Sequence, residues 1–169
     1  RLMDADLAQL SAQVGAWLKG RGLRLASAES CTGGWVAQVL TATAGSSEWF
    51  ERGFVTYSNE AKQESLGVSA QTLAAQGAVS EQVAAEMALG TLVASRAEVA
   101  LAITGIAGPA GGSPDKPVGT VCFAWVVRGA QPVTRLAHFD GDREAVRRAA
   151  VVFALTRLLD STTLPALNQ

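Results

Sequence analysis

The chain has 169 residues, of which 49% are hydrophobic and 17% are charged, and its formal net charge is -1. A chain of this kind can form a complete hydrophobic core, and no apolar run reaches the roughly 18 residues that a membrane span needs. The balanced charge gives no electrostatic reason to expect a nucleic acid or a membrane surface as partner. We therefore expect one domain over residues 1–169.

The chain opens with a predicted helix over residues 4–19, whose apolar stripe ends at Gly20 or Gly22. No apolar segment of the signal-peptide type follows the first residues, so we expect a cytoplasmic location. A short apolar strand is predicted over residues 23–28, and a helix over residues 33–40.

The middle of the chain contains a predicted loop at residues 45–47 and a second strand at 53–57, rich in aromatic and β-branched residues. Three helices follow, each beginning at a residue whose side chain can cap a helix. The first is expected from Asn59 to Leu66 and the second from Ser69 to about Gln76. The third is longer, begins at Ser80, and carries Leu92 on its apolar face.

The last third of the chain begins with a continuous apolar strand at residues 99–104, typical of a sheet that is covered on both faces. A glycine- and proline-rich loop follows over 105–117. Residues 118–127 and 133–139 then predict two strands joined by a hairpin-sized connection. Asp142 caps a final predicted helix through Leu159, and we expect a frayed tail after it.

This order of elements favours an α/β sandwich whose parallel core is extended by an antiparallel hairpin, which makes the sheet mixed. Ligands of such sheets bind outside the carboxyl ends of the parallel strands. The first three predicted strands end in polar clusters, so these clusters would meet at one edge of the sheet. They are Glu29-Ser30, Tyr57-Ser58-Asn59 and Thr104-Gly105.

Ser30 is the first candidate nucleophile, and a serine hydroxyl needs a base to accept its proton. The single histidine, His138, falls in the last predicted strand and is taken as a strand residue. Lys62 follows Ser30 by about one β-α-β unit and would lie beside it, with Tyr57 relaying or orienting the proton. Lys62 would have to be neutral, which burial favours. The alternative is a solvated Lys62 and a Tyr57 that packs on the sheet.

Two neighbours of Ser30 leave alternatives open. Cys31 is a rival nucleophile, or else a small buried residue under the sheet. Glu29 orients a hydroxyl of the ligand or pairs with a buried cation. With Cys122 as the only other cysteine, and neither residue set in a metal-type spacing, we expect no metal site.

Two sets of anion-binding groups are predicted. Backbone N–H groups of Thr32, Gly33 and Gly34 would stabilise an oxyanion. Arg143 and Arg147 stand four residues apart, share a helix face, and would clamp a phosphate or carboxylate, unless they belong to a solvated basic face.

Five motifs in chain order resemble the signature of the CinA C-terminal domain family, from about residue 5 to 160. They are Ala28-Glu29-Ser30-Cys31-Thr32-Gly33-Gly34, Tyr57-Ser58-Asn59-Glu60-Ala61-Lys62, Gly77-Ala78-Val79-Ser80, Thr104-Gly105-Ile106-Ala107-Gly108-Pro109 and Gly119-Thr120-Val121. The resemblance implies a three-layer α/β/α domain. It also implies hydrolysis of the carboxamide of nicotinamide mononucleotide, a small-molecule substrate, to nicotinate mononucleotide and ammonia in pyridine nucleotide recycling.

Matched by position, Ser30 is the family's nucleophile, Lys62 with Tyr57 is its activating pair, and Thr104 and Gly105 line the pocket. The reaction needs no cofactor and no metal. The rival interpretation is a module that binds a nucleotide phosphate on the same edge without catalysis. A free sheet edge in the closing hairpin also predicts a homo-oligomer, most simply a dimer.

Overall fold

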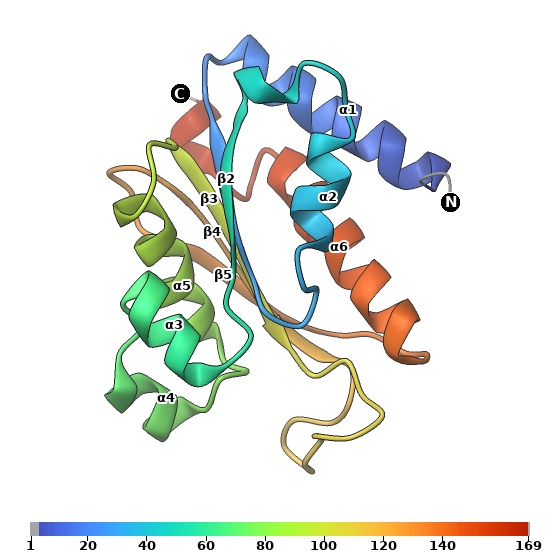
Figure 1. Cartoon of the computed structure of the whole chain (residues 1–169), viewed down its shortest axis with the longest axis vertical. Coiled ribbons are helices and arrows are strands. Elements are labelled where there is room, and N and C mark those ends of the chain that lie inside the picture. Colours follow the sequence, from blue (N-terminus) through green and yellow to red (C-terminus); the bar gives the residue numbers. More distant parts are fainter. Residues whose placement is uncertain (1–3, 169) are drawn as a thin grey trace.

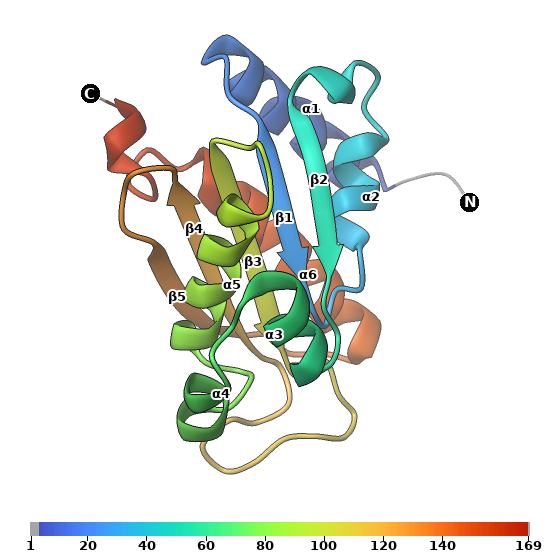
Figure 2. The same cartoon turned by 60° about the vertical axis from the view of Figure 1, so that its left-hand side comes forward.

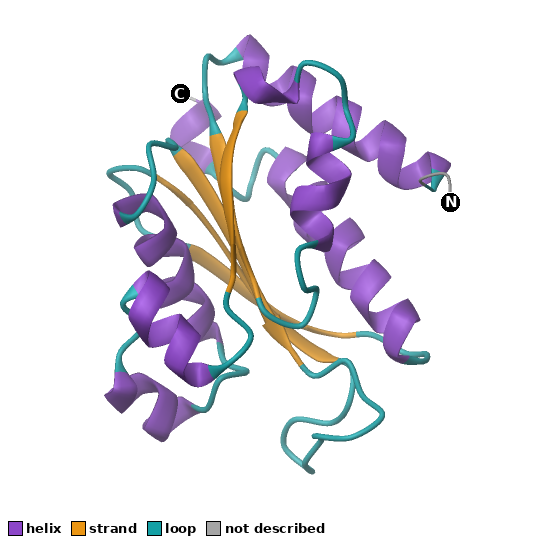
Figure 3. Cartoon of the chain, in the orientation of Figure 1, coloured by secondary structure: helices purple, strands orange, loops and turns teal. Residues whose placement is uncertain are grey.

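The computed structural model describes residues 4–168 and shows a five-stranded mixed sheet between two layers of helices (Figures 1 and 3). The strands are β1 (Leu25–Glu29), β2 (Phe50–Val55), β3 (Val99–Gly105), β4 (Thr120–Val127) and β5 (Val133–His138). Their order in the sheet is β2-β1-β3-β4-β5. β1 is parallel to both of its neighbours, whereas β4 and β5 are antiparallel to the strands beside them. The predicted α/β sandwich with a mixed, partly parallel sheet is therefore confirmed.

Helices lie on both faces of the sheet, as Figure 2 shows from a second direction. The first layer consists of α1 (Ala5–Gly20), α2 (Trp35–Thr41) and α6 (Arg143–Leu159). The second consists of α3 (Asn59–Leu66), α4 (Ala70–Gln76) and α5 (Glu81–Val93). Within residues 4–168, no helix combines the length and apolarity that crossing a bilayer requires.

The two faces of the sheet are packed by side chains of different size. Leu101, Phe123 and Trp125 face α1 and α6, where Trp125 Nε1 donates a hydrogen bond of 2.9 Å to Ala154 O. Alanines such as Ala102 face α5, so that helix lies close to the strands. Because successive strand residues alternate between the two faces, the continuous apolar runs of β3 and β4 supply side chains to the cores on both faces of the sheet.

Helix caps follow the predicted residues with one correction. Ser69, Ser80 and Asp142 accept hydrogen bonds from the first-turn amides of α4, α5 and α6. The cap of α3 is Ser58 instead of Asn59, because Ser58 is extended and its Oγ accepts a bond of 3.0 Å from Ala61 N. A serine one position earlier competes equally well for the cap.

Other boundaries differ from the sequence-based prediction. The helix expected from residue 33 begins at Trp35, because Gly33 and Gly34 have positive φ angles of 62° and 101° that no α-helix contains. The predicted loop at residues 45–47 instead leads into a 3₁₀ turn, η1 (Ser46–Glu48), and β2 begins already at Phe50.

The tail after residue 160 is not frayed in the way we expected. It forms a further 3₁₀ turn, η2 (Pro165–Asn168), and Leu164 is buried in the core of the α1 and α6 layer. This apolar anchor explains why the chain stays ordered beyond α6.

The strand order brings the polar strand ends together. β1 lies between β2 and β3, and its last residue Glu29 is paired with Val55 on one side and Ile103 on the other. The antiparallel β4 starts at this same edge, and β5 ends there, since Thr120 is paired with His138. All five strands of the sheet therefore have one end on the same side of the sheet, and this line of strand ends is the edge at which the site lies.

Candidate active site

A serine and a lysine meet at this edge. Ser30 directly follows β1, and its Oγ lies 3.1 Å from Nζ of Lys62, which stands on α3. Ser30 points toward the α3 layer because strand residues alternate, and the crossover from β2 brings α3 to that side. The structure thus places Lys62 beside Ser30, as the spacing of one β-α-β unit predicts.

The Lys62 side chain is almost fully buried, with 1% of its surface exposed. Its Nζ donates to the backbone oxygens of Thr56 at 3.1 Å and Tyr57 at 3.3 Å in addition to the serine contact. Within the part of the chain that the structure describes, no carboxylate forms an ion pair with it. Burial lowers the pKa of Lys62, because desolvation disfavours the ammonium form.

The ammonium form of Lys62 can donate to all three of these oxygens. The neutral form has two N–H donors and one lone pair. In that form the carbonyls of Thr56 and Tyr57 can accept both N–H bonds, which leaves the lone pair for the hydroxyl proton of Ser30. The arrangement can therefore take a proton from Ser30, and the resulting ammonium keeps all three acceptors.

The Tyr57 hydroxyl is not directed at Lys62. It accepts a hydrogen bond of 2.9 Å from Arg143 Nη2, and the side chain is 61% exposed. Arg143 also donates through Nη1 to Gly108 O at 2.7 Å, so it ties the glycine-rich loop to Tyr57. Tyr57 supplies its backbone carbonyl to the lysine and its phenol ring to the entrance of the cavity.

A cavity of about 260 Å³ adjoins this pair. Gly105 is one of its lining residues, and a Cβ at this position would collide with Val121. Thr104 Oγ1 donates to Ala78 O at 2.9 Å, so its hydroxyl holds the segment before α5. Side chains and backbone of the following residues line the cavity: Ser30, Cys31, Tyr57, Asn59, Lys62, Ala78, Val79, Thr104 to Gly108, Ala110, Gly111 and Arg143.

Cys31 borders the same cavity but lacks the setting of a reactive thiol. Its side chain belongs to the core on the α2 and α6 side and is 6% exposed. Burial raises the pKa of Cys31 to about 11, so the thiol is protonated at neutral pH. Of the two candidate nucleophiles, Ser30 is the one hydrogen-bonded to Lys62.

Glu29, which we expected to contact the ligand or pair with a cation, lines neither cavity described here. Its Oε1 accepts hydrogen bonds from Thr32 Oγ1 at 2.7 Å and Val36 N at 2.9 Å, and its Oε2 accepts one from Ala37 N at 3.2 Å. Burial raises its pKa, and these bonds oppose that shift. Glu29 therefore holds the turn at residues 30–34, which carries Ser30, against the start of α2.

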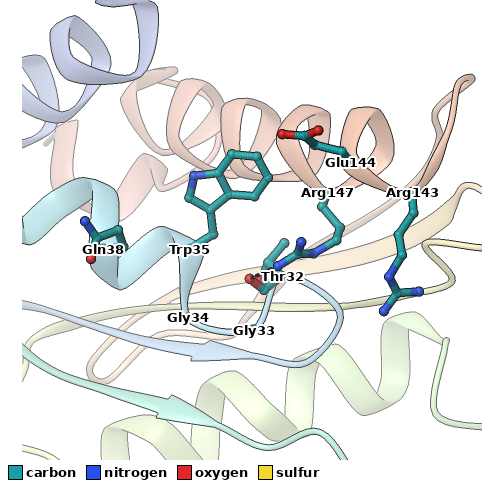
Figure 4. Close-up of a pocket in the computed structure, with 8 residues that line it drawn as sticks. All are labelled: Thr32, Gly33, Gly34, Trp35, Gln38, Arg143, Glu144 and Arg147. Atoms are coloured by element: carbon teal, nitrogen blue, oxygen red, sulfur yellow. Dashed lines mark hydrogen bonds between the residues drawn. The ribbon is translucent and has the colours of Figure 1, made fainter. Parts of the chain in front are cut away.

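A second cavity, of about 700 Å³, lies on the other side of this turn (Figure 4). Its walls are Thr32, Gly33, Gly34, Trp35, Gln38, Arg143, Glu144 and Arg147. Only Arg143 is shared with the smaller cavity. Apart from Glu29, the residues that we predicted for one pocket are thus divided between two cavities that share Arg143.

Arg147 is directed at the turn, as Figure 4 shows. Its Nε donates to Cys31 O at 3.0 Å and its Nη2 donates to Thr32 O at 3.3 Å. The guanidinium carbon lies 5.5 Å from the centre of the Trp35 ring, within cation–π range. Arg143 extends separately from the first turn of α6, so the two arginines do not form one forked clamp.

The remaining findings concern His138, the backbone acceptors of Lys62 and the side chains that could bind a metal. His138 lies at the same sheet edge but contacts Val118 O at 2.9 Å and lines neither cavity. The carbonyls of Thr56 and Tyr57 were missed as partners of Lys62, because no side-chain pattern signals a backbone acceptor. Among residues 4–168, no three His, Cys, Asp or Glu side chains cluster as metal ligands would.

Residues 7–162 match the CinA C-terminal domain family. The chain is 59% identical over 157 residues to the nicotinamide-nucleotide amidohydrolase PncC of Escherichia coli K12, covering 93% of this chain and 95% of that protein. A longer CinA-like protein of Syntrophobacter fumaroxidans is 55% identical over 145 residues, which are 86% of this chain and 34% of that protein. The crystal structure of the competence/damage inducible protein CihA from Agrobacterium tumefaciens matches with a TM-score of 0.90 at 45% identity, covering 100% of this chain and 99% of that one.

Proposed function

The chain belongs to the CinA C-terminal domain family, and we propose that it hydrolyses the carboxamide of nicotinamide mononucleotide to nicotinate mononucleotide and ammonia. The similarity to a nicotinamide-nucleotide amidohydrolase over nearly the full length of both chains supports this substrate. The observation that carries the proposal is the 3.1 Å contact between Ser30 Oγ and a buried Lys62 Nζ that has no acidic partner among the described residues.

In the first step, Ser30 Oγ attacks the carboxamide carbon while its proton moves to Lys62 Nζ. A C–O bond forms, and the electron pair of the C=O bond moves onto the carbonyl oxygen. The lysine can accept the proton because burial lowers its pKa and the carbonyls of Thr56 and Tyr57 stabilise the ammonium that results. A backbone amide of the turn at residues 30–34 stabilises the oxyanion.

In the second step, the tetrahedral intermediate collapses and the C–N bond breaks. The leaving nitrogen takes a proton from the Lys62 ammonium and departs as ammonia, which leaves an ester between Ser30 and the nicotinoyl group. A water molecule then gives a proton to the neutral Lys62 and attacks the ester carbon. Collapse of this second intermediate returns the proton to Ser30 and releases nicotinate mononucleotide.

The size and charge of the cavity support the same substrate. We place the pyridine carboxamide in the 260 Å³ cavity next to Ser30 and the phosphate at its entrance, near Arg143 and Tyr57. Arg143 suits a phosphate because its guanidinium offers several N–H donors in one plane. The reaction would return nicotinamide mononucleotide to pyridine nucleotide synthesis.

The test measures ammonia and nicotinate mononucleotide released from nicotinamide mononucleotide by wild type, Ser30→Ala and Lys62→Met. We expect each variant to lose at least about 10³-fold in kcat. The matched control is Arg148→Gln, since Arg148 lies outside both the small cavity and the turn and pairs with Asp4. Near-native turnover by a folded Ser30→Ala variant would refute the mechanism, and equal loss in Cys31→Ala would move the nucleophile to Cys31. Binding without turnover in wild type would indicate a phosphate-binding module.

We also propose that two copies of the chain associate. The sheet ends in two edge strands, β2 and β5, and each exposes a large apolar side chain, Val55 and Leu136. Pairing or covering such an edge is the usual way in which proteins avoid non-specific association. Light scattering tests this, and a monomer mass that is independent of concentration would contradict it.

A further inference from the structure

The small cavity beside Ser30 is lined by basic side chains and by no acidic one. Its lining residues, all in the described part of the chain, include Lys62 and Arg143 but no aspartate or glutamate. Lys62 is 1% exposed, and burial is costly for a charge without a partner of opposite sign. This charge matters for the substrate proposed above, because the pyridine ring of nicotinamide mononucleotide is itself a cation.

The acidic side chains on the elements around Lys62 do not offset this charge. Glu29 on β1 is bonded to Thr32 and to the first amides of α2. The acids of α5 and α3 bond to other groups or are exposed: Glu86 accepts from Ser69 N, Glu81 accepts from Thr134 Oγ1, and Glu60 and Glu64 are exposed. An ionised Cys31 would favour the ammonium form, but its pKa of about 11 keeps the thiol protonated at neutral pH. The balance between ammonium and amine is therefore sensitive to the charge of the ligand that enters the cavity.

The reaction brings the charged ring close to the lysine. Ser30 Oγ lies 3.1 Å from Lys62 Nζ. At the start of the attack, the carboxamide carbon lies about 3–3.5 Å from this oxygen and the ring nitrogen is three bonds further, so the ring nitrogen lies within roughly 10 Å of Nζ. At this separation, repulsion between two positive charges in a protein site shifts the equilibrium from ammonium to amine by about tenfold.

The phosphate of the substrate carries the opposite charge but acts on Lys62 more weakly. We place it beyond the ribose at the cavity entrance, near Arg143 and the Tyr57 hydroxyl. Tyr57 is 61% exposed there, so water screens the phosphate, and the arginine balances part of its charge. The ring is therefore the substrate charge that Lys62 experiences most strongly.

We propose that the positive ring of the substrate expels the proton of Lys62 into the solvent, so that binding of the substrate produces the free base that activates Ser30. This inference rests on the function proposed above and narrows its substrate class to carboxamides on a cationic ring. A neutral ring of the same shape excludes water from the cavity to the same extent but lacks the repulsion. It therefore leaves more of the lysine in the ammonium form, which cannot take the proton of Ser30.

The first test measures protons released on binding, by calorimetry of Ser30→Ala in buffers of different ionisation enthalpy from pH 6 to pH 10. The two ligands are nicotinamide mononucleotide and the C-nucleotide of benzamide, in which a carbon replaces the ring nitrogen and the ribose phosphate is unchanged. We expect the cationic ring to release up to one proton per site within this range, and the neutral ring clearly less. In the double variant Ser30→Ala/Lys62→Met, the two ligands should release protons equally.

The second test uses the pH profile of wild type. The profile of kcat/KM reports the protonation of the free enzyme, and that of kcat reports the enzyme–substrate complex. For nicotinamide mononucleotide, kcat should begin to fall on the acid side about one pH unit below the point at which kcat/KM begins to fall. The cationic ring also makes the carboxamide carbon more reactive, but this changes the height of a profile and not its position on the pH axis.

The product should have the opposite effect. Nicotinate mononucleotide carries a carboxylate at the reacting carbon, closer to Lys62 Nζ than the ring nitrogen is, and this carboxylate stabilises the ammonium form. We expect wild type to take up protons when it binds the product. Inhibition by the product should therefore become stronger as the pH falls.

Three outcomes would overturn the proposal. Equal proton release with both rings would show that exclusion of water, and not the charge of the ring, deprotonates the lysine. A difference between the two rings that persists without Lys62 would assign the proton to another group. Profiles of kcat and kcat/KM that coincide on the pH axis would show that the substrate does not change the lysine. In all three cases wild type still releases ammonia, whereas its failure to do so would refute the proposed function itself.

Discussion

Replacing Lys62 with methionine separates the charge of this buried residue from its packing. Methionine fills similar space with an unbranched chain, but it leaves the carbonyls of Thr56 and Tyr57 without their donor. Each unpaired carbonyl costs about 1–3 kcal/mol, and this cost does not depend on pH. The pH dependence of the difference between the two proteins therefore reports the titration of Lys62 alone.

The sign follows from the direction of the pKa shift. In the unfolded chain, Lys62 titrates at its ordinary pKa of 10.5, and burial lowers this value in the folded protein. Between the two pKa values, the unfolded state binds more protons than the folded state. The unfolding free energy of wild type therefore rises with pH in this window, with a slope of up to about 1.4 kcal/mol per pH unit. Below the folded pKa, the slope from this residue is zero.

Urea unfolding of wild type and Lys62→Met, followed by circular dichroism from pH 7 to pH 10, gives the difference at each pH. We expect wild type to gain stability relative to the variant as the pH rises. The value of kcat/KM of wild type should level off at the pH where this gain begins, because both depend on the folded-state pKa of Lys62. A difference that stays flat over the whole range would show that the pKa of Lys62 is not lowered.

Three further substitutions give clear expectations. Cys31→Ala should keep most of the ammonia-releasing activity, and iodoacetamide at pH 7 should not inactivate wild type, because a thiol with a pKa of about 11 is protonated there; rapid inactivation would contradict this. Glu29→Ala should lower the urea-unfolding free energy by roughly 2–4 kcal/mol, since it removes the acceptor of one hydroxyl and two helix amides, and a change below 0.5 kcal/mol would show that these hydrogen bonds are dispensable. Gly90→Ala should destabilise by about 2 kcal/mol, because the new Cβ would collide with Leu66 O at the end of α3. Its control, Gly20→Ala, meets open space and should leave the melting temperature unchanged or slightly raised.

Much of the fold could be predicted because the strands and helices carry strong local signals. The apolar run at residues 99–104 corresponds to β3, and the caps at Ser69, Ser80 and Asp142 start helices as predicted. Prediction was weaker where long-range packing decides the outcome. Leu164 orders the tail through contacts with α1 and α6, and no local pattern near it indicates this.

The residues that meet in the candidate site were predictable where their positions follow from the order of the strands. Ser30 and Lys62 meet because the parallel neighbours β1 and β2, which precede them, end on the same side of the sheet. The orientation of individual polar groups was not predictable, since it depends on distant partners. The Tyr57 hydroxyl meets Arg143 instead of the lysine, and Arg147 turns to backbone carbonyls.

The alternation of β1 explains how a glutamate can adjoin the nucleophile without disabling its base. Glu29 and Ser30 are successive residues, so their side chains leave the sheet on opposite faces. The carboxylate of Glu29 is bonded to Thr32 and the first amides of α2, whereas Ser30 Oγ meets Lys62 on the α3 side. A carboxylate beside the lysine would raise its pKa and keep it protonated. Glu29 and Arg147 both hold the turn from the α2 and α6 side. Lys62 stays buried with no carboxylate beside it among the described residues, and this burial favours the neutral form that the mechanism requires.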